Sequence, residues 1–309
     1  MSSIKLMCRT LTPFSADGKI DETAMRWHLR RLVENRIGIY PASGGVGEAY
    51  AMTMAEIRRV YDIAVDECKG KVPVYANPPE QHTADGTIAH ARIAIEAGCD
   101  AVNVYPIAGW HGFRPREEEL RGYYDTILTQ IKHPVTLTAS AVGGQMPPAR
   151  LIADVVNKHR QIIGVNLHGG DGYFVELKDR VNRDVDYYCH LTGSLNEFLL
   201  GANGMLCQEA TIIPKSFRQF INHYEKGEFA QMGPLNAGIL RFISVIAKWS
   251  PGNARPTKMC IAVLKLPGWQ GGSRPPNVIP GADQLDALLD GLRKVGLPEI
   301  DEMLRAAAG

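Results

Sequence analysis

The chain has 309 residues, of which 45% are hydrophobic and 22% are charged, and 34 basic residues against 33 acidic ones leave a formal net charge of +1. A chain of this length and composition can bury a large apolar core, which predicts a soluble globular protein. It has no run of Lys and Arg residues that would follow a phosphate backbone, so the charge pattern argues against nucleic acid as a partner.

The first residues lack the long apolar segment of a secretory signal, and no stretch of about 18 purely apolar residues occurs that would span a bilayer. We therefore expect a cytoplasmic protein that does not contact a membrane. The six cysteines are scattered without Cys-x-x-Cys spacing, which favours reduced, mostly buried thiols over disulfides or a zinc site. We accordingly expect neither a metal nor another cofactor.

Short apolar segments alternate along the chain with longer segments of helical periodicity, a pattern typical of βαβ units that build a parallel sheet. Eight apolar segments are predicted to be strands, at residues 5–10, 38–42, 72–77, 101–105, 135–138, 162–166, 186–191 and 204–208. Eight such strands predict an α/β fold, a (β/α)8 TIM barrel. We expect the barrel domain to occupy residues 1–226.

Amphipathic helices are predicted between the strands at residues 22–35, 54–68, 84–97 and 117–131. Asp21, Thr53 and Thr83 precede three of them and are suitable N-caps, and Gly98 is suited to end the third. More helices are predicted after the eighth strand, at residues 217–226, 229–250, 257–264 and 282–294. We expect residues 227–309 to form a C-terminal helical domain outside the barrel.

Functional residues of such barrels gather at the C-terminal ends of the strands. The sixth predicted strand is central, because its apolar residues 162–165 are followed by the polar Asn166 and then by His168. After the second strand, residues 43–48 read Ser-Gly-Gly-Val-Gly-Glu. Small residues there would let backbone N–H groups surround an anion such as a carboxylate, although a plain turn has the same composition.

Several short motifs occur in a fixed order along nearly the whole chain. They are Leu11-Thr12-Pro13-Phe14, Gly44-Gly45-Val46-Gly47-Glu48, Ala97-Gly98-Cys99-Asp100-Ala101, Ile163-Gly164-Val165, Gly201-Ala202-Asn203-Gly204-Met205, Lys258 and Gly272-Ser273-Arg274-Pro275-Pro276. In this order they resemble the dihydrodipicolinate synthase and N-acetylneuraminate lyase family. The resemblance implies a (β/α)8 barrel with a C-terminal helical domain, assembled as a homodimer or homotetramer.

The resemblance also implies class I aldolase or lyase chemistry, in which a lysine of the sixth strand forms a Schiff base with a 2-oxo acid and a tyrosine of the fifth strand relays protons. At the corresponding positions this chain has Asn166 and Thr138, and Gly45 and Val46 replace two threonines of the second-strand loop. An amide nitrogen is not nucleophilic, whereas imine formation needs an amine that attacks a carbonyl. The chain is therefore identified as a divergent member of the family that lacks the Schiff-base lysine.

Polar residues at the altered positions favour a rebuilt pocket over an abandoned one. We expect His168 to transfer a proton, because an imidazole titrates near neutrality, and Asn166 and Thr138 to bind a carbonyl or enolate oxygen. The expected substrate-binding residues are Ser43, Gly44, Gly45, Val46, Glu48, Tyr105, His111 and Ser140. The predicted function is a lyase that acts on a small 2-oxo acid or related carboxylate by a lysine-independent route.

These residues also have structural interpretations. His168 can simply bond to backbone, Glu48 can cap the segment that follows it, and Trp110 and His111 can pack against a neighbouring subunit. A metal in place of the imine would need a convergent set of ligands, for which only His168, Glu48 and Glu209 are available from different strands. The alternative function is a non-catalytic barrel that binds a small acid or serves as a scaffold.

Overall fold

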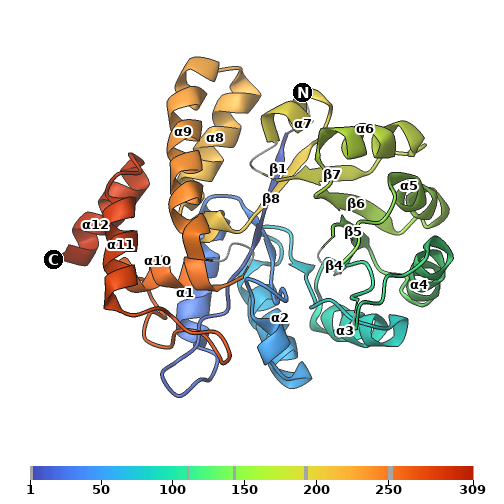
Figure 1. Cartoon of the computed structure of the whole chain (residues 1–309), viewed down its shortest axis with the longest axis horizontal. Helices are drawn as coiled ribbons and strands as arrows, with labels where there is room; N and C mark the ends of the chain where they lie inside the picture. The colour runs from blue at the N-terminus through green and yellow to red at the C-terminus, as the bar shows by residue number, and fades with distance from the viewer. Residues whose placement is uncertain (1–2, 110, 142–143, 191–193, 250–252, 309) are drawn as a thin grey trace.

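The structure is a computed structural model, and it describes residues 3–109, 111–141, 144–190, 194–249 and 253–308. Within these ranges, eight parallel strands form a barrel that is surrounded by helices, and a group of C-terminal helices lies against one side of it (Figure 1). The predicted (β/α)8 barrel with C-terminal helices is confirmed.

The strands are β1 (Lys5–Arg9), β2 (Gly38–Tyr40), β3 (Tyr75–Ala76), β4 (Ala101–Val104), β5 (Val135–Ala139), β6 (Ile162–Leu167), β7 (Asp186–Cys189) and β8 (Gly204–Cys207). They pair in the order β2-β1-β8-β7-β6-β5-β4-β3. Ile39 joins β2 to the β3 segment, because it pairs with Val74 and its N–H donates to the Pro73 carbonyl at 2.9 Å. The predicted strands therefore all lie in the barrel, with ends that differ by three residues at most.

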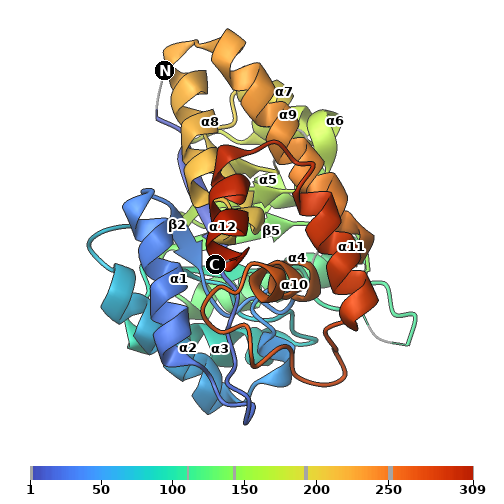
Figure 2. The ribbon, with the colours of Figure 1, turned by 90° about the vertical axis from the view of Figure 1, so that its left-hand side faces the viewer.

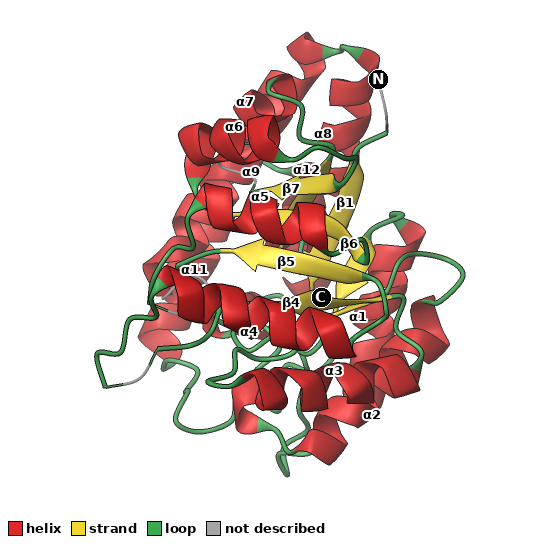
Figure 3. Ribbon diagram, turned by 90° about the vertical axis from the view of Figure 1, so that its right-hand side faces the viewer, coloured by secondary structure: helices red, strands yellow, loops and turns green. Residues whose placement is uncertain are grey.

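A helix follows each strand in turn: α1 (Glu22–Glu34), α2 (Met54–Cys68), α3 (Ala84–Ala97), α4 (Glu117–Gln130), α5 (Ala149–Lys158), α6 (Gly170–Arg180), α7 (Ser194–Leu199) and α8 (Pro214–Lys226). Figure 3 shows α3 to α6 covering the outside of the sheet. The sequence predicts a helix that contains Lys178, which corresponds to α6, but it gives no bounds for α5 to α7. The glycines at the start of α6 and the six-residue length of α7 make both weak helix signals in the sequence.

The predicted helix ends are confirmed where their caps are described. The side chains of Asp21 and Thr83 each accept a hydrogen bond from a backbone N–H three residues later. Thr53 forms a reciprocal capping box with Glu56, and Gly98 ends α3 in the left-handed conformation with φ of 91°. These local contacts satisfy backbone groups that the first and last helical turns leave unpaired.

The C-terminal helices are α9 (Phe229–Ile246), α10 (Arg255–Val263), α11 (Ala282–Leu292) and α12 (Pro298–Ala308), and Figure 2 shows them together on one side of the barrel. Helix α9 packs against α8 and α11. The segment Phe229–Trp249 has a mean hydropathy of 1.2 and could cross a membrane by length and composition alone. The segment contains Pro234 and Arg241, and Arg241 Nε donates to the Val295 carbonyl at 2.8 Å. A charged side chain that bonds to another part of the chain suits a helix of a folded domain. The domain boundary expected at residue 226 stays a prediction.

His28 links the barrel to the C-terminal segment. It lies on α1 and is 4% exposed, and its Nε2 is 2.9 Å from the carbonyl oxygen of Pro267. Burial in this apolar contact disfavours the charged ring and lowers the pKa of His28 to about 4. His28 is therefore neutral in the folded protein at pH 7 and donates its Nε2–H to the carbonyl.

We expect acid to weaken this contact. The folded-state pKa of about 4 lies below the usual value of 6.5, so the unfolded chain binds more protons between these two pH values. The contribution of His28 to stability is complete above about pH 6.5 and is lost as the pH falls through 4, a change of about 3 kcal/mol. Urea unfolding of the native chain and of His28→Gln from pH 7 to pH 4 measures it. A difference between the two proteins that stays constant with pH would contradict this assignment.

Candidate active site

A cavity of about 610 Å³ opens at the C-terminal ends of the barrel strands. Its described lining comes from the ends of seven strands or the segments after them: Arg9, Ser43, Gly44, Gly45, Val46, Tyr50, Glu80, Tyr105, His168, His190, Gln208 and Glu209. Parallel strands bring these distant residues together because their C-terminal ends meet at one mouth of the barrel. The cavity is therefore the candidate active site.

Six residues predicted for the site line this cavity: Ser43, Gly44, Gly45, Val46, Tyr105 and His168. Five other predicted residues do not line it: Thr138, Asn166, Ser140, Glu48 and His111. The first four of these are buried, whereas His111 is exposed. Trp110 lies outside the described residues.

The loop after β2 is tightly folded. Ser43 Oγ accepts a hydrogen bond from the Gly47 N–H at 2.9 Å, and a Cβ on Gly47 would lie 2.6 Å from the Ser43 nitrogen, so only glycine fits there. Ala42 and Glu48, at the two ends of the loop, have positive φ angles of 60° and 55°. Such left-handed conformations cost energy in residues other than glycine and persist where the surrounding structure enforces them.

Gly44, Gly45 and Val46 line the cavity, and each carries a backbone N–H group. Among the described residues, no atom accepts a hydrogen bond from any of the three. The Glu80 carboxyl group packs against Gly44, where an added Cβ would lie 2.5 Å from Glu80 Oε2. Burial raises the pKa of the Glu80 carboxyl group. The loop therefore has the unpaired backbone donors that the predicted anion-binding role requires.

Arg9, His168 and His190 form a three-membered cluster at the mouth. Arg9 Nη2 lies 3.2 Å from His168 Nε2 and 3.1 Å from His190 Nε2, and the two imidazole nitrogens are 3.0 Å apart. The ring centroids are separated by 4.0 Å. Period-two alternation along β1, β6 and β7 directs all three side chains into the barrel mouth.

The histidines of this cluster are bases rather than cations at neutral pH. Burial, and after it the positive charge of Arg9, lowers the pKa of His168 and of His190. His168 as a whole residue is nevertheless exposed, and it lines the cavity. A neutral imidazole that reaches a cavity can accept a proton from a ligand, as expected for His168.

Below the cavity, Asn166 belongs to a buried hydrogen-bond network. It is 1% exposed, and its Nδ2 donates to Asn103 Oδ1 at 3.0 Å and to Thr138 Oγ1 at 3.2 Å. Thr138 Oγ1 in turn donates to Asn103 Oδ1 at 2.9 Å, and Tyr40 donates to Asn166 Oδ1 at 3.5 Å. The polar atoms of Asn166 and Thr138 therefore bond to neighbours in the barrel. Their expected contact with a substrate oxygen stays a prediction.

Glu48 makes a buried ion pair with Lys258 of α10, and their side chains are 0% and 4% exposed. Lys258 Nζ also lies 4.2 Å from the centre of the Phe14 ring, and the Arg274 N–H donates to Glu48 Oε1 at 3.2 Å. Glu48 is the N-cap residue of the short 3-10 helix Ala49–Ala51, and its carbonyl accepts from the Ala51 N–H at 2.9 Å, but its side chain makes no capping hydrogen bond. Glu48 instead connects the loop after β2 to the C-terminal helices.

Six residues of the described cavity lining are missing from the predicted site: Arg9, Tyr50, Glu80, His190, Gln208 and Glu209. Arg9 and His190 fall inside segments that were predicted to be strands, although alternation from the buried Met7 would have placed Arg9 on the inner face. Glu80 follows two prolines after β3, and no local pattern marks it. Only the closure of the barrel shows that these side chains meet.

The possible metal ligands His168, Glu48 and Glu209 are not brought together, because Glu48 is paired with Lys258. In the part of the chain that the structure describes, no group of three or more His, Cys, Asp or Glu side chains is arranged to hold a metal ion. The six cysteines are buried free thiols, as expected from their spacing.

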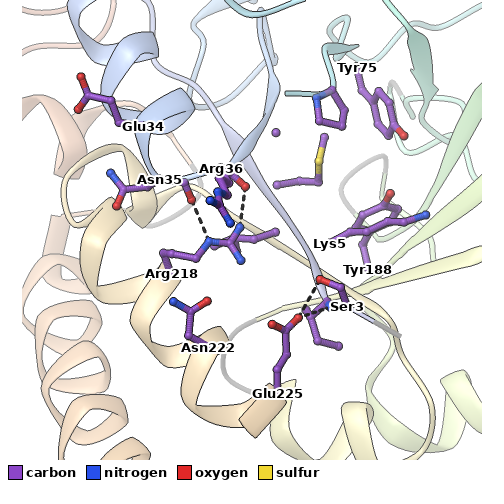
Figure 4. A pocket seen from close by; sticks show the side chains of 15 residues that line it. Ser3, Lys5, Glu34, Asn35, Arg36, Tyr75, Tyr188, Arg218, Asn222 and Glu225 are labelled. Carbon is purple, nitrogen blue, oxygen red and sulfur yellow. Dashed lines mark hydrogen bonds between the residues drawn. The ribbon is translucent and has the colours of Figure 1, made fainter. Parts of the chain in front are cut away.

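A second cavity of about 820 Å³ lies at the opposite, N-terminal ends of the strands (Figure 4). Arg218 there donates from Nε to the Asn35 carbonyl at 2.8 Å and from Nη2 to the Arg36 carbonyl at 2.6 Å. Glu225 accepts hydrogen bonds from the Ser3 hydroxyl and from the backbone N–H of Ile4. These charged groups hold chain segments together, so we take the smaller cavity at the barrel mouth as the functional one.

Comparison with known proteins shows the family. A model described as the dihydrodipicolinate synthetase family matches residues 2–288. A 4-hydroxy-tetrahydrodipicolinate synthase of Methanopyrus kandleri is 26% identical over 297 residues, which cover 93% of this chain and 94% of the relative. A probable 5-dehydro-4-deoxyglucarate dehydratase of Bradyrhizobium sp. is 33% identical over 130 residues, 41% of this chain and 39% of the relative.

A solved structure supports the fold independently. The E. coli K12 prophage protein YagE, which belongs to the dihydrodipicolinic acid synthase family and was crystallised in complex with pyruvate, superposes with a TM-score of 0.85 at 19% identity. The match covers 96% of this chain and 99% of that structure. At this identity the likeness concerns the fold alone.

We expect Lys258→Met to destabilise the protein by about 3–5 kcal/mol, because it leaves the Glu48 carboxylate buried without a partner. Lys258→Met combined with Glu48→Gln should lose less, since no buried charge then remains. The matched control is Lys215→Met, which breaks an exposed pair with Glu302 and should change stability by less than about 1 kcal/mol. Urea unfolding of the three variants tests this, and equal losses for Lys258→Met and Lys215→Met would contradict it.

Proposed function

This chain belongs to the dihydrodipicolinate synthetase family of lyases and aldolases, and we propose that it is a lyase that acts on a small 2-oxo acid or related carboxylate without a Schiff-base lysine. The observation that carries this proposal is the cavity at the barrel mouth. Its described lining contains one arginine and two histidines but no lysine. The cavity therefore offers anion-binding and proton-transfer groups but no amine nucleophile.

The position of Asn166 supports the lysine-independent route. By the family resemblance Asn166 stands where the Schiff-base lysine would be, and it lies on β6 two residues before His168. Its amide is part of a hydrogen-bonded network that leaves no room for a charged ammonium group without breaking several bonds. The buried Lys258 does not replace that lysine, because it pairs with Glu48 and does not line the cavity.

The residues around the cavity have distinct roles in this proposal. The N–H groups of Gly44, Gly45 and Val46 bind a negatively charged oxygen of the substrate. His168 takes up or delivers a proton as the neutral imidazole. Tyr105 and Ser43 lie in the same lining and complete the contacts with the substrate. The network of Asn166 and Thr138 forms the floor beneath them.

The names of the relatives favour an acidic substrate. One relative is named as a 4-hydroxy-tetrahydrodipicolinate synthase and another as a probable 5-dehydro-4-deoxyglucarate dehydratase. Both names describe compounds that carry carboxylates. A small-molecule carboxylate is accordingly the expected ligand, and the homodimer or homotetramer in the cytoplasm is the expected form of the protein. Light scattering at several protein concentrations measures that assembly.

We expect borohydride reduction in the presence of pyruvate to leave the protein mass unchanged, because the described lining of the cavity contains no lysine amine to form an imine. Intact-protein mass spectrometry measures this. A family member that does form the pyruvate imine, treated in parallel, shows that trapping works. A covalent pyruvate adduct on this protein would contradict the lysine-independent route, and peptide mapping of the adduct would identify the lysine responsible.

We expect His168→Gln to lower turnover by about 10² to 10⁴-fold, because it removes the proton acceptor while keeping a polar side chain. Acids that raise the melting temperature, chosen from a panel of 2-oxo and hydroxy acids, are the substrates to test. His133→Gln is the control, since that ring lies 2.9 Å from the Cys99 carbonyl outside the cavity lining. Binding without turnover would favour the non-catalytic alternative, and full activity of His168→Gln would exclude the proposed proton transfer.

A further inference from the structure

The contacts between Arg9, His168 and His190 cannot all be hydrogen bonds at once. Each Nε2 atom carries either a hydrogen or a lone pair in a neutral ring. If both carry lone pairs, Arg9 can donate to both, but the two lone pairs then face each other at 3.0 Å. If one Nε2 atom carries a hydrogen, it can donate that hydrogen to the Nε2 atom of the other ring. The same N–H group then lies 3.1–3.2 Å from Arg9 Nη2, which is also a donor, so that contact cannot be a hydrogen bond. One contact of the three is therefore always unfavourable.

Arg9 also has an unsatisfied donor. Its Nε is buried, and no described residue accepts a hydrogen bond from it. Buried N–H groups of this kind normally find a partner, because an unmade hydrogen bond to a charged group is costly. Arg9 therefore has an N–H group without a described acceptor, and it lines the cavity.

From this geometry we propose that Arg9 anchors a carboxylate of the ligand and that the ligand, by drawing Arg9 N–H groups to itself, leaves His168 and His190 free to share one proton. A guanidinium carries planar pairs of N–H donors that match the two oxygens of a carboxylate, and Arg9 lines the cavity. Once Arg9 donates to the ligand, one imidazole can donate its Nε2–H to the other without a competing donor. This inference rests on the proposed function only in using the same cavity.

The charge around the cluster favours a carboxylate over other anions. Arg9 is the one cationic side chain in the described lining of the cavity, which also contains the carboxyl groups of Glu80 and Glu209. Surroundings with so little positive charge suit one carboxylate at Arg9 better than a phosphate dianion. Arg9 also argues against a metal held by the two histidines, since its positive charge lies within 3.2 Å of both Nε2 atoms. The proposed ligand class is therefore an organic acid with at least one free carboxylate.

The proposal includes a change in histidine protonation on binding. A bound carboxylate offsets the Arg9 charge that disfavours the imidazolium, so the proton affinity of the pair rises and proton uptake from solvent increases as the pH is lowered from 7. The other titratable groups that line the same cavity are Tyr50, Glu80, Tyr105 and Glu209. Asp171 on α6 and Glu197 on α7 are the acidic residues on the helices after β6 and β7 that lie nearest in sequence.

Binding of matched acids and amides tests the anchor. Calorimetry of the full-length protein with pyruvate and pyruvamide, and with malonate and malonamide, compares a carboxylate with a neutral group of similar shape. We expect at least one acid to bind and its amide to bind roughly 10 to 100-fold more weakly. Arg9→Gln should lose this preference, and Arg9→Lys should keep part of it because the charge remains but the planar donor pair does not. Arg92→Gln, an exposed arginine that bonds to Gln130, is the control.

Histidine NMR gives a readout that a purely structural role of Arg9 would not change. In the native protein the acid should shift the ¹⁵N resonances of both His168 and His190 and raise the pH at which they titrate. Arg9→Lys, if folded by circular dichroism, should show a smaller shift. Absence of binding by every acid, or an unchanged preference for acids in Arg9→Gln, would overturn the anchor. Unchanged histidine spectra on binding would overturn the shared proton.

The outcomes also separate this inference from the proposed lyase activity. Binding that depends on Arg9 but yields no turnover with any acid would contradict the lyase and leave the anchor in place. Turnover that persists in Arg9→Gln with an unchanged KM would contradict the anchor and leave the lyase in place.

Discussion

The interior of the closed barrel can hold polar side chains only if they satisfy one another, and the structure depends on this constraint. Asn103 receives hydrogen bonds at one oxygen from Thr136, Thr138 and Asn166 at 2.9–3.2 Å. A partner removed from such a network would leave a buried polar group unpaired, at a cost of about 1–3 kcal/mol. Tyr40 joins this network to an adjoining cluster, in which its ring packs with Met7, Tyr188 and Leu206 while its hydroxyl donates to Thr136 and Asn166. The network therefore fixes the spacing of β4, β5 and β6 beneath the cavity.

This floor determines what the barrel mouth can do. Because Asn166 is bonded within the network, the next inward residue of β6, His168, is the first on that strand to reach the cavity. His190 on the neighbouring β7 segment and Arg9 at the end of β1 reach the same height, and their nitrogen atoms meet within 3.2 Å. The described lining of the cavity thus brings one cationic group and two neutral imidazoles together at its rim.

The C-terminal helices contribute to the site through a buried contact. The loop that carries the free N–H groups ends at Glu48, whose carboxylate is held by Lys258 of α10 and by the backbone of Arg274. Arg274 also reaches Glu56 on α2 with an Nη2–Oε1 distance of 2.6 Å. The left-handed conformation of Glu48 is maintained by these partners. The shape of the cavity wall therefore depends on residues more than 200 positions later in the chain.

Sequence alone determined the eight strands, the capped helices α1 to α3 and the family, because periodicity and capping are local and the family motifs are short. It also pointed to the loop of Ser43 to Val46, Tyr105 and His168, which line the cavity, since each lies at or just after the end of a predicted strand. Tertiary structure decided the rest. In the folded barrel Arg9 and His190 lie beside His168, and Glu48 pairs with Lys258. Asn166 forms hydrogen bonds within the network below the cavity. Those outcomes depend on which side chains meet when the barrel closes, and a local pattern carries no information about contacts across it.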